Sequence, residues 1–178
     1  MSTSFPPTGR DPEAILSEMA AFRDQDADFR GGRTWSMVYY AGDAHHALME
    51  RAHNLYIAGN ALNPMAFKSL KRMESEVVQM TADLLHGPPS TVGSLTSGGT
   101  ESLLLVVKTY RDRARRIWPW IRRPNAVVPN TIHPAFEKAA HLFGVKLKRV
   151  KVGSSGAVDP KEMAKKVDRN TIFIAASA

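Results

Sequence analysis

The stretch Thr96-Ser97-Gly98-Gly99-Thr100-Glu101-Ser102 lies between a segment of strand character, Thr91–Thr96, and a helical pattern that begins near Thr100. Two glycines allow a ligand to approach the backbone closely at this turn. The start of the helix offers unpaired N–H groups and the positive end of its dipole. Hydroxyl groups of Ser97, Thr100 and Ser102 add further donors. The turn is typical of an anion site, best suited to a phosphate monoester, and a plain strand-to-helix turn is the open alternative.

Two well-known nucleotide-binding loops do not fit this stretch. A Walker A loop requires a Lys directly after its last glycine, and Thr100 stands there instead. A dinucleotide fingerprint requires a third glycine, which the turn lacks. ATP and NAD are therefore poor candidates for the ligand.

The rest of the chain alternates between strand and helix patterns. Helices are predicted where a capping residue or Pro precedes apolar residues spaced three and four apart, starting at Asp11-Pro12, Asp43, Asn63-Pro64, Thr100, His133-Pro134 and Asp159-Pro160. Strands are predicted at Thr91–Thr96, Ala126–Val128, Val145–Val152 and Thr171–Ala176, and Thr34–Tyr40 is expected to be extended. Such alternation predicts an α/β fold with a mostly parallel sheet and flanking helices.

The sheet predicted from these strands looks unfinished. Only Ser177 and Ala178 follow the last apolar strand. A parallel sheet of so few strands leaves an unpaired edge and an uncovered face. We expect the chain to be a truncated piece of a larger protein.

Composition restricts the class of protein. The chain has 178 residues, of which 43% are hydrophobic, as in a globular domain with a real core. Its longest apolar runs, Leu103–Val107 and Ile172–Ala176, are too short to cross a bilayer, and the N-terminus has no signal-peptide pattern. No cysteine is present, which suits a cytoplasmic protein.

Basic residues outnumber acidic ones, 24 Lys and Arg against 17 Asp and Glu, for a formal charge of +7. Most of the excess lies between Lys108 and Lys151. A basic surface can serve nucleic acid, an anionic membrane or a phosphorylated substrate, or it can simply be solvated. The basic residues follow no single stripe, and only Trp118 and Trp120 are interleaved with them, so a nucleic-acid partner is not expected.

Three ordered motifs together resemble sphingosine-1-phosphate lyases, within the group II decarboxylases that use pyridoxal phosphate (PLP). Ser97–Ser102, SGGTES, is similar to the same segment of the lyases. Asn60–Met80, NALNPMAFKSLKRMESEVVQM, resembles their N-P-L-H-P-x-x-F-x-x-L-R-K-x-E-x-E-V-V, and His133–Ala140, HPAFEKAA, resembles their H-x-A-F-x-K-A-A. The resemblance implies the first half of a PLP fold-type I large domain over 61–178, preceded by a helical and extended segment over 1–60.

The same resemblance implies roles for individual residues. Ser97, Gly98, Gly99 and Thr100 would bind the cofactor phosphate, and His133 would stack on the pyridine ring. Three residues are placed on the substrate side: Tyr39 and Asn63 as catalytic groups and Asn60 as a substrate contact. For Tyr39 an aromatic core residue is the alternative, and for an isolated His133 it is a helix cap.

Two positions depart from the lyase motif. Asn63 stands where the lyases carry His, and Ala61 replaces a Pro. Asn can donate a hydrogen bond but cannot carry a charge or move a proton. These changes put the substrate in doubt more than the cofactor.

A PLP enzyme also needs a Lys that binds the cofactor covalently. No Lys of this chain stands in a suitable context, because Lys68, Lys71 and Lys138 lie on helix faces that look solvated. We expect that Lys, and the Asp that pairs with the pyridine nitrogen, to lie beyond Ala178. The 178 residues alone are then not a competent enzyme.

The resemblance implies a homodimeric carbon–carbon lyase that cleaves the C2–C3 bond of a phosphorylated long-chain amine, a retro-aldol reaction giving a long-chain aldehyde and phosphoethanolamine. A PLP-dependent amino-acid decarboxylase is the nearest alternative. A basic nucleic-acid-binding domain and an inactive fragment are alternatives of another class. No metal site is expected, because His45, His46 and His53 lack zinc-site spacing.

Overall fold

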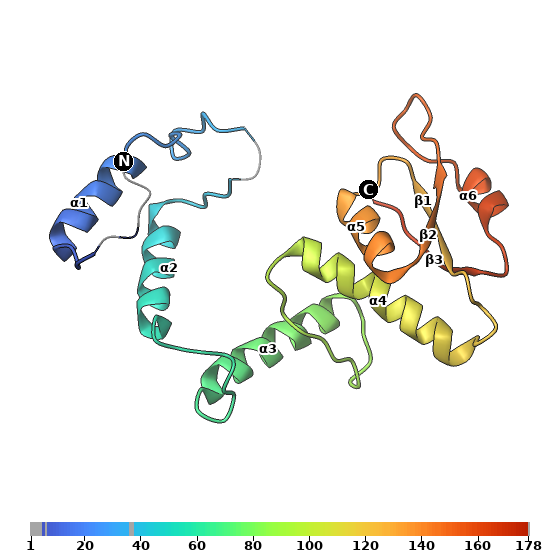
Figure 1. Ribbon diagram of the computed structural model, residues 1–178, viewed down its shortest axis with the longest axis horizontal. Coiled ribbons are helices and arrows are strands. Elements are labelled where there is room, and N and C mark those ends of the chain that lie inside the picture. The colour runs from blue at the N-terminus through green and yellow to red at the C-terminus, as the bar shows by residue number, and fades with distance from the viewer. Residues whose placement is uncertain (1–4, 6, 36–37, 178) are drawn as a thin grey trace. The chain divides into compact units, whose positions relative to one another are not determined.

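The computed structural model describes residue 5, residues 7–35 and residues 38–177. Its contacts divide the chain into two compact units, Met1–Lys71 and Arg72–Ala178. The division falls inside helix α3 (Lys68–Leu84), whereas the sequence predicted a boundary between residues 60 and 61. Figure 1 labels the helices and strands of both units.

The first unit contains two helices, and only the first of them starts with a side-chain cap. Helix α1 (Pro12–Arg23) has Pro12 in its first turn, and the Asp11 carboxylate accepts a hydrogen bond from the N–H of Ala14 at 3.1 Å. Helix α2 (Asp43–Tyr56) starts at Asp43, but Gly42 occupies the capping position and makes no side-chain cap, and the Asp43 carboxylate accepts from the Tyr40 hydroxyl at 2.6 Å. Neither helix buries a residue fully.

The predicted helix start at Asn63-Pro64 is wrong, because α3 begins at Lys68. Asn63 instead closes a turn, accepting hydrogen bonds on its carbonyl from the N–H groups of Ala66 and Phe67. The apolar periodicity of α3 is real, yet its residues Met80 and Leu84 are 65% and 78% exposed. The pattern therefore predicted a helix correctly but not the burial of its apolar face.

The second unit is the predicted α/β structure. Along the chain its elements are α4 (Gly99–Ile117), β1 (Asn125–Pro129), α5 (Pro134–Phe143), β2 (Lys146–Val150), α6 (Pro160–Lys166) and β3 (Thr171–Ile174). The strands form one sheet in the order β2-β1-β3, and β1 pairs in parallel with both neighbours. The prediction of a parallel sheet with flanking helices is confirmed.

Helices cover both faces of this sheet. Val107 of α4 and Phe136 of α5 share one buried cluster with Val128, while Met163 of α6 packs with Val127 on the other face. Figure 1 shows α5 and α6 on opposite sides of the strands. The chain passes from β1 to β2 through α5, and then from β2 across β1 to β3 through α6. Because these two crossovers run in opposite directions along the sheet, right-handed connections place their helices on opposite faces. The central strand β1 is buried along its whole length.

One predicted strand does not form. Residues 91–96 have no strand partner within the described part of the chain. The N–H of Leu95 donates instead to the Glu74 side chain of α3 at 3.0 Å. The predicted extended segment Thr34–Tyr40 includes residues 36 and 37, which lie outside the described residues, and no strand is assigned to the rest of it.

Candidate functional site

The glycine turn leads directly into the first turn of α4. Gly98 is the capping residue, with φ 158° and ψ 174°, and Gly99 begins the helix. A Cβ atom added to either glycine would meet no atom within 4 Å, so the space beside the turn is open to a ligand. The unpaired N–H groups of a helix start point into such space and favour an anion.

Side chains inside the turn hold its shape. The Glu101 carboxylate accepts hydrogen bonds from both the N–H and the hydroxyl of Ser97, each at 2.7 Å. These bonds, the backbone one first, lower the pKa of Glu101 and keep it ionised. The hydroxyls of Thr96 and Ser102 lie 2.7 Å apart and bond to each other.

These hydrogen bonds distinguish predicted phosphate donors that already have a partner from those that do not. The donors of Ser97 are directed at Glu101, so its predicted contact with a phosphate would require a change of partner. Thr100 is exposed in the first turn of α4, and its hydroxyl has no partner among the described residues. The role of Glu101 was missed by the sequence reasoning, although a Glu at the third helical position is the spacing of a capping box.

His133 caps helix α5. Its Nδ1 accepts a hydrogen bond from the N–H of Ala135 at 3.1 Å, and Pro134 follows it in the first turn. An accepting Nδ1 carries no proton, so the proton of the neutral ring is on Nε2. The cap and the cofactor contact are compatible, because the cap uses one ring edge and leaves the ring faces available. His133 lies just beyond the carboxyl end of β1.

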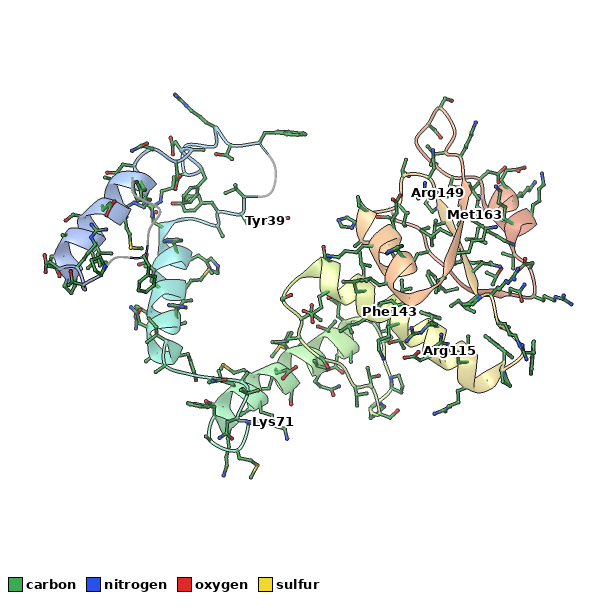
Figure 2. The ribbon with its side chains drawn as sticks, in the orientation of Figure 1. Tyr39, Lys71, Arg115, Phe143, Arg149 and Met163 are labelled. Carbon is green, nitrogen blue, oxygen red and sulfur yellow. The ribbon has the colours of Figure 1, made fainter. Side chains whose placement is uncertain are left out.

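The starts of α4 and α5 lie at the same edge of the sheet. The guanidinium of Arg111 on α4 stacks over the ring of Phe143, at the end of α5, 5.0 Å from its centre (Phe143 is labelled in Figure 2). An α-helix rises 1.5 Å per residue, so Gly99 lies about 18 Å before Arg111 along the axis of α4. Pro134 lies about 14 Å before Phe143 along the axis of α5, so the two helix starts are at similar distances from the contact. At its other end α4 is followed by Trp118, which borders a hollow with Thr171 at the start of β3.

Both helices therefore run against the strands and begin at the strands' carboxyl edge, where ligands bind in parallel α/β sheets. The structure brings Ser97, Gly98, Gly99 and Thr100 to the same edge as His133. A hollow of ≈ 400 Å³ adjoins the turn and is lined in part by Thr96, Ser102 and Tyr110. This edge can hold a phosphate at the start of α4 and a flat ring against an imidazole.

The three predicted substrate-side residues lie in the first unit. Tyr39 is 97% exposed and borders a hollow of ≈ 750 Å³ together with His45, His46 and other residues (Figure 2). The side-chain oxygens of Asn60 and Asn63 accept hydrogen bonds from the N–H groups of Leu62 at 2.7 Å and Ala66 at 3.2 Å. Each Asn therefore stabilises a turn and keeps its amide N–H groups for another partner.

Two other features are absent from the residues that the structure describes. No group of three or more His, Asp or Glu side chains among them is placed to hold a metal ion. None of the helices that the structure describes is both long enough and apolar enough to span a membrane.

Comparison with known proteins confirms the predicted resemblance. The chain is 34% identical to mouse sphingosine-1-phosphate lyase 1 over 174 residues and 36% identical to the Drosophila melanogaster lyase over 183 residues. These alignments cover 98% and 99% of this chain but 30% and 33% of the relatives. The chain thus spans about a third of the curated lyases it matches. No family model matches it.

Solved structures confirm the predicted fold. The sphingosine-1-phosphate lyase of Burkholderia pseudomallei matches with a TM-score of 0.84 and 33% identity, over 98% of this chain and 42% of that one. The glutamate decarboxylase of Lactobacillus brevis matches with a TM-score of 0.75 and 17% identity, over 98% of this chain and 41% of that one. The chain has the PLP fold-type I architecture that these enzymes share, over part of their length.

Proposed function

We propose that the chain is the cofactor-phosphate part of a PLP-dependent lyase that cleaves the C2–C3 bond of a phosphorylated sphingoid base. The observation that carries the proposal is the shared sheet edge of the α4 start and His133, in a chain similar to sphingosine-1-phosphate lyases over nearly its whole length. The covalent Lys is expected in the part of the relatives that this chain does not match.

The residues present fit the phosphate and ring of PLP. The open space at Gly98 and Gly99 admits a phosphate to the backbone N–H groups of α4, and the Thr100 hydroxyl can add a charge-assisted hydrogen bond. His133 is held by its cap with a ring face available for stacking. When bound, PLP supplies an electron sink for the carbon next to the substrate amine.

The chain's own residues then fix and orient the reactants. Glu101 keeps the turn in shape through Ser97, so the α4 start is organised before the ligand arrives. Tyr39 and the amide of Asn60 are proposed to contact the substrate, because they match lyase residues with that role, and the amide of Asn63 is proposed to do so from the position where the lyases carry His. Asn63 can orient a substrate oxygen by donating a hydrogen bond, but another group must take up the C3 hydroxyl proton.

An amino-acid decarboxylase is the second candidate function. Asn63 stands in place of the lyase His, and the chain is also 31% identical over 175 residues to a probable L-tyrosine/L-aspartate decarboxylase of Methanocella arvoryzae. That alignment covers 96% of this chain and 43% of the relative. Both reactions break a bond at the same carbon with the same cofactor, so the phosphate part of the site serves either one.

Product analysis separates the two candidates. The complete protein, loaded with PLP, is incubated with a phosphorylated sphingoid base and, separately, with tyrosine, aspartate and glutamate. A lyase gives a long-chain aldehyde and phosphoethanolamine in equal amounts and releases no carbon dioxide. Carbon dioxide from an amino acid, without aldehyde from the sphingoid base, would replace the lyase proposal by the decarboxylase.

Assembly and location are further proposals. We expect a homodimer, as the resemblance implies, which sedimentation of the complete protein would test. A cytoplasmic location is a prediction from the absence of cysteine.

A further inference from the structure

The segment between α4 and β1 has an unusual composition. Residues Arg113–Arg123, RARRIWPWIRR, hold five Arg, two Trp, two Ile and no acidic residue, a net charge of +5 within the +7 of the chain. We call it the Arg–Trp segment. It belongs entirely to the second unit. None of the site residues discussed above lies in it.

Most of its charges are exposed and unpaired. Four exposed arginines have no carboxylate partner among the described residues: Arg115, Arg116, Arg122 and Arg123. Arg115, labelled in Figure 2, lies in the last turn of α4. Several basic residues elsewhere in this unit do bind acidic ones, as Arg149 does with Glu137 at 2.7 Å and Lys148 with Asp168 at 2.6 Å.

The apolar part of the segment is held in a fixed turn. The backbone N–H of Trp118 donates to the Ala114 carbonyl at 2.7 Å, and the backbone N–H of Ile121 donates to the Trp118 carbonyl at 2.9 Å. Ile121 is buried in the core, and the Arg113 guanidinium lies 5.6 Å from the Trp118 ring centre. The side chain between these anchors, Trp120, is 68% exposed, and Ile117 is 42% exposed.

This surface is at the edge of the sheet opposite the phosphate site. Trp118 and Trp120 border a shallow hollow of ≈ 160 Å³ with Arg169 and Thr171, at the amino end of β3. Arg169 is also exposed and adds a further positive charge. Substitutions at the exposed arginines therefore leave the carboxyl edge of the sheet intact.

We propose that the Arg–Trp segment is a docking surface for an anionic lipid membrane. Exposed arginines are attracted to anionic headgroups, and Trp prefers the level of the headgroups, where its ring is partly apolar and its N–H stays hydrated. Large apolar side chains are exposed elsewhere in this unit as well, and this segment differs by presenting Trp120 and Ile117 directly among unpaired arginines. Single-stranded nucleic acid would need several exposed rings for stacking, and this turn presents one.

The test measures vesicle binding by the full chain. Vesicles of phosphatidylcholine with about 30 mol% phosphatidylserine are compared with pure phosphatidylcholine, at low and high salt, in a sedimentation assay. Binding to the anionic vesicles is expected to fall steeply with salt, and little is expected on the neutral ones. The assay contains no PLP and no substrate, so its outcome is independent of the lyase proposal.

Two variants and one control locate the surface. Replacing Arg115, Arg116, Arg122 and Arg123 by Gln is expected to weaken binding about hundredfold or more, at about fivefold per arginine. Trp120→Ala is expected to weaken binding about tenfold without changing its salt dependence. The control replaces four exposed lysines outside the segment by Gln, Lys138, Lys146, Lys151 and Lys161, and removes the same charge. It is expected to bind within about threefold of the parent chain.

Three results would overturn the proposal. The first is no binding to anionic vesicles at low salt. The second is an equal loss in the lysine control, which would make the attraction a property of net charge alone. The third is tighter binding to a single-stranded oligonucleotide than to the vesicles, with the arginine variant losing it, which would assign the segment to nucleic acid. Circular dichroism of each variant checks that the fold is unchanged.

Discussion

Replacing Thr100 by Val tests the phosphate site through a single hydroxyl. Val has nearly the shape of Thr, so the first turn of α4 loses one hydrogen-bond donor and little else. The Thr100 hydroxyl has no partner among the described residues, which leaves it for a ligand. A hydrogen bond to a charged group contributes about 1.5–3 kcal/mol. Because Thr100 is exposed, we expect the lower end, about a tenfold rise in the PLP dissociation constant.

The matched control is Ser102→Ala, two residues later in the same helix. The Ser102 hydroxyl is already bonded to the Thr96 hydroxyl at 2.7 Å. Its removal disturbs the turn slightly but takes no free donor from the ligand. We expect the PLP dissociation constant to change less than about threefold.

The assay is equilibrium dialysis of the protein against PLP and, separately, against pyridoxal, which lacks the phosphate. Thr100→Val should weaken PLP binding and leave pyridoxal binding unchanged. Equal weakening for both ligands would show that Thr100 acts on the ring or on the fold. An unchanged dissociation constant for PLP, or a loss as large in Ser102→Ala, would refute the assignment of Thr100 to the phosphate.

Three further predictions concern the fold that supports the site. Val128→Ala removes two fully buried methyl groups from the central strand and should lower the free energy of unfolding by about 2 kcal/mol in urea denaturation. Gly144→Ala places a Cβ at φ 65°, at the end of α5, and should cost about 1 kcal/mol in the same assay. Hydrogen bonds from Lys148 first, then Asn125, hold the pKa of Asp168 well below its ordinary 3.8, so its contribution to stability is present above pH 3.8 and is lost as the pH falls further. Asp168→Asn should therefore flatten the acid side of the stability profile, and an unchanged profile would contradict this.

Local signals predicted the helices of the second unit well. His133-Pro134 and Gly144 bracket α5, and the Asp159 carboxylate accepts from the N–H of Lys161 at 2.8 Å at the start of α6. Each of these bonds joins residues a few positions apart, so the residue types alone reveal them. The apolar run Ala126–Val128 likewise revealed the central strand, because a parallel strand buried on both faces has no polar alternation.

Features that depend on distant partners could not be predicted in this way. Residues 91–96 have strand character, but strand formation requires a neighbour, and Glu74 of α3 takes the N–H of Leu95 instead. The register shift between β1 and β3 at Asn125 is also non-local: the Asn125 side chain bonds Asp168 at 2.9 Å and the Thr171 hydroxyl at 2.8 Å, more than forty residues along the chain. Periodicity gives the face of an element, while its partner is set by the rest of the fold.

In the candidate site too, some features follow from local sequence and others depend on the folded structure. The predicted phosphate site is built from a turn and a helix start, so its residues are recognisable in the sequence. The structure adds which of its hydroxyl groups already have hydrogen-bond partners. Ser97 illustrates what the sequence could not supply: its donors belong to Glu101, and the free donor is Thr100. A hydroxyl near a phosphate turn can either shape the turn or bind the ligand, and only the bonding pattern distinguishes the two. For that reason the Thr100 and Ser102 variants, which remove chemically similar hydroxyls from one helical turn, should differ in their effect on PLP.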